Sequence, residues 1–366
     1  MFVRKLTLSN FKNYPEAELF FSEKINCFVG NNGIGKTNLL DAIHYLSFCK
    51  SYFSTIDSQN IRHESDFFSI LGTCVRPGDI SESIHCIQKR GQKKRFLVNK
   101  TEYERLSDHI GNVPLVMISP YDRDLINDGS EERRKYIDSV ISQFDKLYLD
   151  DLICYNRALN QRNMLLRIFS EQHRFDQQAL EVWDEQLIPL GTAIFRKRMA
   201  FLQDFIPIFR DYYEFLTACG EHVDIRYSSQ LEQTSFRELL AGSLKKDQSV
   251  QFTTTGIHKD DLELLLNGYP IKRFGSQGQQ KSFVIAIKLA QFDYTCKVKG
   301  YKPLLLLDDV FDKLDDLRVQ QLIRMVSNDS FGQVFITDTQ EEKVRRIFDA
   351  IAIEHRFFTL PEKKNP

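Results

Sequence analysis

The first thirty residues predict short β-strands. Apolar and polar residues alternate from Phe2 to Leu8 and from Ala17 to Phe21, and an apolar run covers Ile25 to Val29. Alternation with a period of two is typical of half-buried strands, and a short apolar run is typical of a strand buried on both faces. From Thr37 to Leu46 the apolar residues recur every three or four positions, which predicts an amphipathic helix. A strand, a Gly-rich turn and a helix are therefore expected in this order.

Further along the chain the pattern changes three times. Residues 68–98 return to alternation, with Arg90-Gly91-Gln92 as the expected hairpin turn between Ile84–Lys89 and Lys93–Val98. Leu115 to Ser119 is a buried type of strand. Residues 121–246 are helical in spacing, and strand character resumes near Gln251.

The last part of the chain alternates between helix and buried strand. A helix is expected after Gly278, and buried strands are expected at Leu304–Leu307 and Val334–Thr337. The chain has no internal repeat and no long heptad array. The outline predicts an α/β domain of residues 1–120 and 247–366, split by a mainly helical arm of residues 121–246.

Composition indicates a soluble globular protein with a concealed charge asymmetry. The 366 residues hold 49 Lys and Arg against 50 Asp and Glu, a net charge of −1, and a uniform charge of this size argues against a nucleic-acid partner. The arm, however, holds 17 basic and 21 acidic residues, so it carries −4 and the rest of the chain carries +3. The net charge is therefore negative in the arm and positive in the rest of the chain.

The N-terminus and the cysteines point to the cytoplasm. No signal-peptide segment or membrane-length apolar run is present. Seven scattered cysteines without a CxxC pair predict neither a disulfide framework nor a zinc site, which fits a reducing compartment.

One eight-residue segment carries the strongest chemical signal. It fits the phosphate-loop pattern GxxxxGK[ST] and lies between a predicted strand and a predicted helix, as that motif requires. Its glycines let backbone N–H groups surround a polyphosphate at a helix N-terminus. Lys36 is expected to reach the β- and γ-phosphates, and Thr37 to ligate Mg²⁺. The segment is Gly30-Asn31-Asn32-Gly33-Ile34-Gly35-Lys36-Thr37.

Two carboxylates end the buried strand at 304–307. Acids at the C-terminal end of such a strand lie where open α/β sheets bind ligands. We expect Asp308 to hold the Mg²⁺ shell and Asp309 to orient or deprotonate the attacking water. Lys36, Asp308 and Asp309 are thus the expected catalytic residues.

A third segment, Phe274 to Ser282, opens the helix that precedes these acids. By itself it is a polar loop with Ser276 as an N-cap. The three segments in this order resemble the ABC ATPase superfamily. More closely, the chain resembles the RecF family of bacterial recombination-repair proteins, ATPases of the structural-maintenance-of-chromosomes (SMC) type with a short arm. The resemblance rests on Leu8–Tyr14, Ser119–Asp122, Arg133-Arg134, Tyr155–Arg157, Gln161–Asn163, Gly256–Leu262, Gly275–Gln280, Leu307–Phe311 and Leu314-Asp315.

The resemblance implies a function and further site residues. It implies an ATP-dependent homodimer that binds duplex DNA near single-strand gaps. With RecO and RecR, such a dimer helps to load RecA in recombinational repair, replication restart and the SOS response. It implies that Ser276 and Gly278 touch the γ-phosphate bound to the partner subunit, and that Leu314-Asp315 line the dimer seam. ATP and Mg²⁺ are the implied cofactors, and weak DNA-dependent ATP hydrolysis is the implied activity.

Several positions depart from the family pattern. Asp309 stands where many ABC proteins have Glu, which is usual for this family and implies slow hydrolysis. The switch position at Thr337–Thr339 lacks a histidine. Phe53 replaces a frequent Arg, and Ile257 and Lys259 replace Pro and Arg.

A basic hairpin is the candidate DNA contact. Between residues 89 and 105 the chain carries a local net charge of +5, which suits phosphate contacts without sequence readout. The alternative is a solvated strand edge protected by lysines. Arg196-Lys197-Arg198 is a second candidate. The expected DNA-binding residues are Lys89, Arg90, Lys93, Lys94 and Arg95.

Two other functions remain open from the residues. One is a small-molecule NTPase or kinase of the phosphate-loop class, and the other is a DNA-binding scaffold that binds nucleotide without hydrolysing it. His258, Asp260 and Asp261 could ligate a metal, but a lone histidine among acids in a loop favours a structural role.

Overall fold

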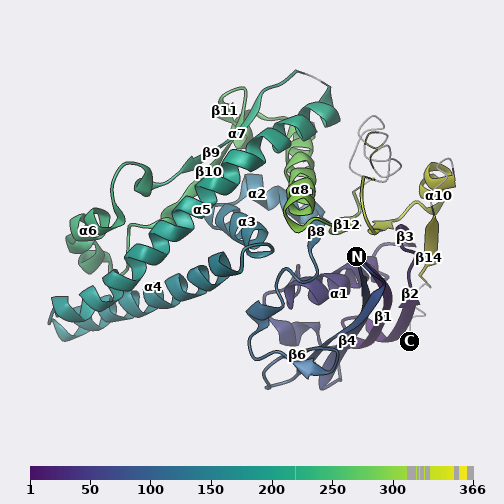
Figure 1. The fold of residues 1–366 in the computed structure, drawn as a ribbon, viewed down its shortest axis with the longest axis horizontal. Coiled ribbons are helices and arrows are strands. Elements are labelled where there is room, and N and C mark those ends of the chain that lie inside the picture. The colour runs from purple at the N-terminus through teal and green to yellow at the C-terminus, as the bar shows by residue number, and fades with distance from the viewer. Residues whose placement is uncertain are drawn as a thin grey trace. The chain divides into compact units, whose positions relative to one another are not determined.

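The computed structural model describes residues 1–218, 220–310, 319, 321, 325, 330–349 and 354–360. Contacts divide the chain into two compact units. The first unit comprises Met1–Asp122, Tyr212–Ala218 and the described residues from Val284 onward. The second unit comprises Arg123–Asp211 and the described residues up to Phe283. In Figure 1 the colour follows the residue number, so the segments of each unit can be traced along the chain.

A five-stranded parallel sheet forms the centre of the first unit, in the order β14-β3-β13-β12-β8. The apolar runs expected at 25–29, 304–307 and 334–337 all form strands of this sheet, so these predictions are confirmed. Its three central strands are buried at every position, as parallel strands covered on both faces must be. The strands are β3 (Ile25–Val29), β8 (Leu115–Ile118), β12 (Leu304–Asp308), β13 (Val334–Asp338) and β14 (His355–Thr359).

A six-stranded antiparallel sheet is the second layer of this unit, in the order β2-β1-β4-β5-β6-β7. The expected hairpin is confirmed, because β5 and β6 pair with Ile87 opposite Arg95 and Gly91 lies in the turn. The strands are β1 (Phe2–Phe11), β2 (Tyr14–Phe20), β4 (Phe67–Arg76), β5 (Ile80–Lys89), β6 (Arg95–Val98) and β7 (Thr101–Glu102).

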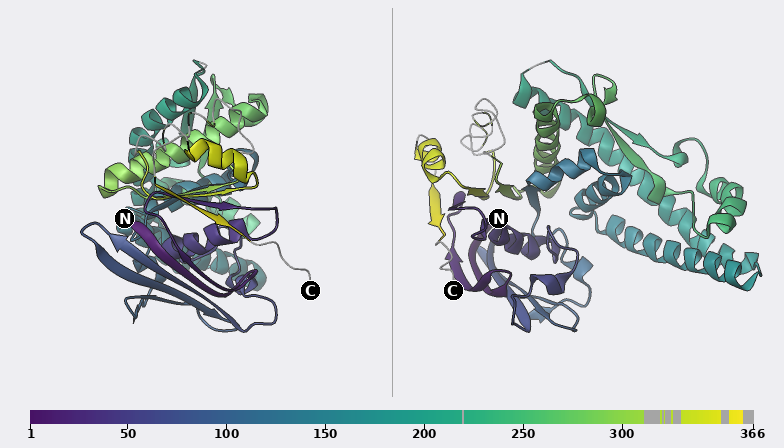
Figure 2. Two further views of the ribbon diagram at one scale, coloured as in Figure 1. Left: turned by 90° about the vertical axis from the view of Figure 1, so that its right-hand side faces the viewer. Right: turned by 180° about the vertical axis from the view of Figure 1, so that it is seen from behind.

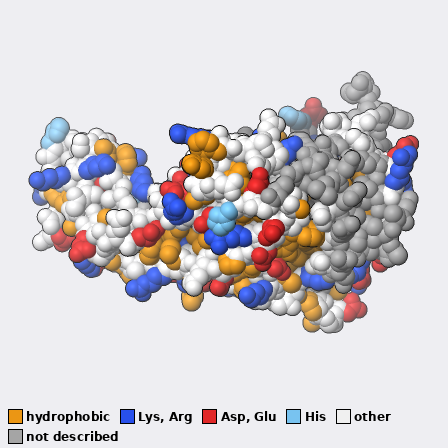
Figure 3. Space-filling model, turned by 90° about the horizontal axis from the view of Figure 1, so that it is seen from above, with side chains coloured by type: hydrophobic (Ala, Val, Ile, Leu, Met, Phe, Trp, Pro, Cys, Tyr) orange, Lys and Arg blue, Asp and Glu red, His pale blue; other side chains and the backbone are white. Residues whose placement is uncertain are grey.

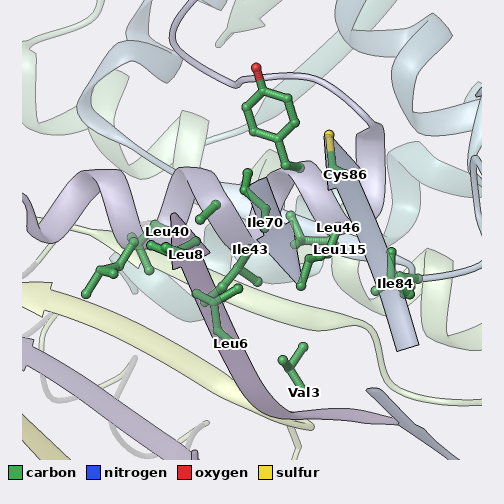
Figure 4. Close-up of a cluster of buried hydrophobic side chains, with 14 of the residues drawn as sticks. Val3, Leu6, Leu8, Leu40, Ile43, Leu46, Ile70, Ile84, Cys86 and Leu115 are labelled. Atoms are coloured by element: carbon green, nitrogen blue, oxygen red, sulfur yellow. The ribbon is translucent and has the colours of Figure 1, made fainter. Parts of the chain in front are cut away.

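Helix α1 (Lys36–Phe48) lies between the two sheets and contacts strands of both. The predicted helix from Thr37 is thereby confirmed. Figure 4 shows Leu40, Ile43 and Leu46 of α1 among apolar side chains of β1, β4, β5 and β8. Figure 2 (left) shows the part of α8 (Gln277–Lys299) that belongs to the first unit, from Val284 onward, and α10 (Glu341–Asp349) on the opposite side of the parallel sheet. The phosphate-loop helix is therefore anchored in the main core of this unit.

The second unit consists of helices and a three-stranded antiparallel sheet, in the order β11-β10-β9. Its long antiparallel helices are drawn in teal in Figure 1. The strands are β9 (Val223–Ser228), β10 (Asp261–Leu266) and β11 (Tyr269–Pro270). The helices are α2 (Asp124–Asn127), α3 (Ser130–Ser142), α4 (Lys146–Gln172), α5 (Gln177–Thr217, which ends in the first unit), α6 (Phe236–Val250) and α7 (Ile271–Phe274).

Two details of this unit differ from the sequence expectation. Strand β9 lies inside the region expected to be helical, and the next strand, β10, begins at Asp261 rather than near Gln251. Because β10 pairs with β9, with Leu264 opposite Ile225, residues up to Phe283 group with the helices in one compact unit. The division into a head and an arm with boundaries at 120 and 247 stays a prediction about domains.

Two further features concern membrane-spanning helices and disulfide bonds, neither of which the sequence predicts. Within the described ranges, no helix combines the length and apolar character needed to cross a membrane. The six described cysteines are free thiols.

Candidate nucleotide-binding site

The phosphate-loop segment connects the end of β3 to the start of α1. Gly30, Gly33 and Gly35 have φ angles of +141°, +79° and +114°, which side-chain-bearing residues rarely adopt. A β-carbon at Gly35 would lie 2.3 Å from Asn13 Nδ2. Asn31, Asn32 and Ile34 complete the same turn. The glycine spacing thus matches the backbone that a phosphate loop needs.

The turn between β1 and β2 holds this loop in place. Asn13 Nδ2 donates to the carbonyl of Ile34 at 2.7 Å, and Asn38 Nδ2 donates to Asn13 Oδ1 at 2.6 Å. The Tyr14 hydroxyl donates to the carbonyl of Gly35 at 3.1 Å, and burial raises the pKa of this phenol well above its usual value. In the sequence, Asn13 and Tyr14 belong only to the segment Leu8–Tyr14 that carries the family resemblance, and no pattern there predicts their contacts with the loop.

Lys36 lies at the first position of α1 and is 4% exposed. Its ammonium donates to the carbonyl oxygens of Gly30 at 2.8 Å and Asn31 at 3.1 Å. The charge is therefore held directly over the loop, where a polyphosphate on the loop amides would meet it.

Thr37 and Asp308 meet although 271 residues separate them. The Thr37 hydroxyl donates to Asp308 Oδ1 at 2.9 Å. They meet because β3, which leads into α1, and β12, which ends at Asp308, both flank β13. Burial raises the pKa of the Asp308 carboxyl, hydrogen bonds from Thr337 and Thr37 lower it, and the Asp309 charge raises it again.

The donor set at Asp308 fits a small divalent cation. The carboxylate is 3% exposed, and no Lys or Arg in the described part of the chain forms an ion pair with it. Among the described residues its hydrogen bonds come from the neutral hydroxyls of Thr37 and Thr337, and the Lys36 charge lowers its pKa without forming an ion pair with it. Carboxylate and hydroxyl oxygens are ligands that Mg²⁺ prefers. Thr37 and Asp308 are therefore the residues that would hold such an ion.

Asp309 follows the end of β12 with a φ of +48°. Its backbone N–H donates to Thr337 Oγ1 at 2.9 Å. Thr337, which belongs to the switch position without a histidine, thus contacts the segment that holds the two expected catalytic acids. The one available signal was a hydroxyl that follows three apolar residues and precedes Asp338 at the end of the strand.

Ser276 and Gly278 lie in the second unit, at the N-terminus of α8. The Ser276 Oγ accepts a hydrogen bond from the backbone N–H of Gln279 at 3.2 Å, and the Ser276 N–H donates to Gln279 Oε1 at 2.7 Å. This reciprocal pair is a capping box. Ser276 is exposed, so its hydroxyl is accessible at a helix N-terminus. The expected seam residues Leu314 and Asp315 lie outside the described residues.

The basic hairpin is present, but its cations differ in availability. Lys89, Arg90, Lys93 and Arg95 are exposed, whereas the Lys94 side chain is 9% exposed and pairs with Asp57. Lys94 also lies over the ring of Tyr45. Figure 3 shows a different face of the molecule, the one seen from above in the view of Figure 1, and there basic and acidic side chains are interspersed. The Lys94 ammonium therefore contacts other side chains of the protein, and it is less available to a DNA phosphate than the four exposed cations.

The second basic candidate is wrong for Arg198, because that side chain is 1% exposed. Its guanidinium pairs with Asp138 at 2.8 Å and Asp260 at 3.2 Å, and Lys197 pairs with Asp145. Only Arg196 of the three is exposed. A helix turns successive residues to different faces, so a run of three cations rarely forms one surface.

His258 has the structural role that the sequence favoured. Its Nδ1 lies 2.8 Å from the Tyr155 hydroxyl and its Nε2 lies 3.0 Å from the carbonyl of Thr253. Burial lowers the pKa of His258 to about 4. No cluster of metal-ligating side chains occurs among the described residues.

The parallel sheet, the loop at Gly30–Thr37 and the acids after β12 define a P-loop ATPase fold of the ABC and SMC-head type. A family model described as an AAA domain matches residues 5–251. The chain is 50% identical to the DNA replication and repair protein RecF of Bacteroides fragilis over 98% of this chain and 96% of that protein. It is 49% identical to the RecF protein of Flavobacterium johnsoniae over 98% and 100%. The chain belongs to the RecF family.

Solved structures agree with this assignment. The structure of the recombination mediator protein RecF with ATP in the RecFOR pathway matches with a TM-score of 0.86 at 30% identity, over 93% of this chain and 92% of that chain. The SMC head domain of Pyrococcus furiosus with an extended coiled coil, bound to ScpA, matches with a TM-score of 0.58 at 16% identity, over 99% and 94%. This second likeness concerns the fold alone.

Proposed function

We propose that this chain is an ATP-dependent DNA-binding repair ATPase. ATP would close a head-to-head dimer that binds duplex DNA near single-strand gaps and, with RecO and RecR, helps to load RecA; hydrolysis would open the dimer. The observation that carries the proposal is the contact between Thr37 and Asp308, beside the phosphate loop and Asp309. Membership of the RecF family supports it.

The chain's own residues divide the expected work among them. The loop amides and Lys36 would bind the phosphates, while Thr37 and Asp308 would hold Mg²⁺, which would screen the phosphate charge. Asp309 orients the attacking water. Phosphoryl transfer depends mainly on such positioning and charge neutralisation, because little covalent chemistry falls to the protein. Ser276 would complete the site across the dimer.

Sedimentation with ATP, ADP or no nucleotide tests the dimer, with and without gapped DNA. We expect a species near 42.9 kDa without ATP and one of twice that mass with ATP. Ser276→Arg should prevent dimerisation and hydrolysis but spare ATP binding by the monomer. A small-molecule NTPase or kinase would keep its turnover in this variant, because it does not need Ser276.

Hydrolysis distinguishes the ATPase from a nucleotide-dependent scaffold. We expect slow ATP hydrolysis that DNA stimulates and that Asp309→Asn lowers by about a hundredfold, the lower end of the usual contribution of a general base. Equal ATP affinity in the variant and the wild type would show that binding survives. DNA binding with no turnover in the wild type would instead support the scaffold.

A further inference from the structure

The end of strand β13 places one buried hydroxyl between the two acids of the candidate site. Thr337 is 0% exposed and lies opposite Asp308 in the pairing of β13 with β12. Its hydroxyl donates to Asp308 Oδ1 at 2.8 Å. The same oxygen accepts the backbone N–H of Asp309 at 2.9 Å. One side chain thus contacts both the carboxylate of one acid and the backbone of the next.

The Thr337 hydroxyl forms hydrogen bonds that a threonine can form and a valine cannot. A hydroxyl has one donor and two acceptor sites, and both kinds are used here. The three residues before Thr337 in β13, Val334 to Ile336, are apolar and buried. A valine would fill the same volume in this strand, and a buried hydroxyl is unfavourable unless it is hydrogen-bonded. The hydroxyl therefore serves the acids rather than the packing of the strand.

The backbone of Asp309 explains why such a contact is needed. With a φ of +48° it occupies the left-handed region, which costs a residue other than glycine about 1 kcal/mol or more. The hydrogen bond from its N–H to Thr337 opposes relaxation to an extended conformation. Loss of this bond would leave the direction of the Asp309 side chain less well defined.

We propose that Thr337 is a positioning residue that fixes Asp308 and Asp309 relative to each other. Through Asp308 it orients the carboxylate that Thr37 also contacts, and through the Asp309 amide it sets the direction of the water-orienting side chain. This inference rests on the proposed function in that it assigns Asp309 to the attacking water.

Thr337→Val tests the hydroxyl, because it preserves shape and suits a strand. We expect kcat for ATP to fall tenfold or more while KM stays within twofold, since the loss concerns hydrogen bonds to a charged carboxylate and to the Asp309 backbone. Thr337→Ser keeps the hydroxyl and should restore kcat to within threefold of the wild type. Thr359→Val, at the exposed end of β14, is the matched control and should change neither constant.

Two readouts are independent of turnover. The Mg²⁺ concentration that half-saturates binding of a non-hydrolysable ATP analogue should rise at least threefold in Thr337→Val, with analogue affinity in EDTA unchanged. Hydrogen exchange in the peptide 304–310 should also accelerate. Unchanged exchange and unchanged Mg²⁺ dependence would overturn the inference, as would a Ser variant no better than Val.

The two hypotheses fail in different ways. Absence of ATP hydrolysis in the wild type would refute the proposed ATPase, and the Mg²⁺ and exchange measurements would still decide whether Thr337 orders the acids. Wild-type hydrolysis that Thr337→Val leaves intact would refute the role of Thr337 alone.

Discussion

Both compact units contain buried ion pairs, such as Lys288 with Asp122 in the first unit, but the candidate site of the first unit departs from this pattern. In the second unit, Arg162 and Arg198 are at most 1% exposed, and each guanidinium pairs with two aspartates. In the first unit, Asp308 is buried with two hydroxyl donors and no ion-pair partner in the described part of the chain. Ion-paired buried charges support a fold, whereas a buried carboxylate that has no ion-pair partner can serve as a ligand for a divalent cation.

Arg198→Met should break the closed network of the second unit. Removing the cation leaves the buried Asp260 and the partly buried Asp138 without their shared partner, and such a loss costs about 3–5 kcal/mol of unfolding free energy. The single tryptophan, Trp183, lies in α5 of this unit, so its fluorescence in urea reports the change.

Arg196→Met provides the matched control for this experiment, because Arg196 is exposed on the same helix. Surface substitutions of this kind change stability by at most about 0.5 kcal/mol. Equal stability of the two variants would mean that the buried pairs of Arg198 contribute nothing to the fold.

Gly35→Ala, in the phosphate loop of the first unit, should lower the free energy of unfolding by about 2 kcal/mol. Its φ of +114° disfavours alanine, and the new β-carbon would overlap the Asn13 amide. Gly33→Ala has a comparable backbone penalty at +79°, but its β-carbon would meet no atom within 4 Å. We therefore expect Gly33→Ala to destabilise less in nucleotide-free thermal unfolding.

A double variant separates overlap from backbone strain. In Asn13→Ala with Gly35→Ala, the overlapping amide is absent, so the combined loss should be smaller than the sum of the single losses. Strict additivity would show that Asn13 does not restrict this position.

Each of the two units contains a largely buried histidine whose pKa is lowered. Burial lowers the pKa of His44 in α1 and of His258 in the second unit to about 4. The unfolded histidines bind protons from about pH 6.5 downward while the folded ones resist, so stability present above pH 6.5 is lost as the pH falls toward 4. Between pH 7 and pH 5 each should contribute a loss of about 2 kcal/mol.

Urea unfolding at pH 7 and pH 5 checks this expectation in each unit. His258→Gln should flatten the pH dependence seen by Trp183, and His44→Gln should flatten that of hydrogen exchange in α1. Around His258, Lys259 and Arg134 also lower the pKa and Asp247 raises it. An unchanged pH dependence in both variants would assign the loss to other groups.

Much of the fold followed from period and spacing alone. The buried runs at 25–29, 304–307 and 334–337 form strands because parallel strands must be apolar on both faces. Strand β9 was missed because six alternating residues, Val223–Ser228, lie within a long helical pattern. Its pairing with β10 is a tertiary contact, which local periodicity does not encode.

The candidate site was predictable where a motif fixes residue types at fixed spacing. The phosphate loop and the acids after β12 are such cases, whereas Asn13 and Thr337 act through hydrogen bonds that only the fold creates. Arg198 could have been assigned to the interior, since Ile194 and Leu202 lie one helical turn on either side and are buried. A run of three cations concealed that spacing.

Charge reversal in the hairpin should change the free energy least per substituted residue, here the free energy of DNA binding. It tests which unit binds DNA. Lys89→Glu with Lys93→Glu removes two exposed cations without ion-pair partners in the described structure. If both contact phosphates, the slope of log K against log salt should fall in magnitude by about two. The matched control is Lys245→Glu with Lys246→Glu, two exposed lysines of α6 in the second unit, which should leave the slope unchanged. An unchanged slope in the hairpin variant, or an equal change in the control, would remove the hairpin from the DNA contact.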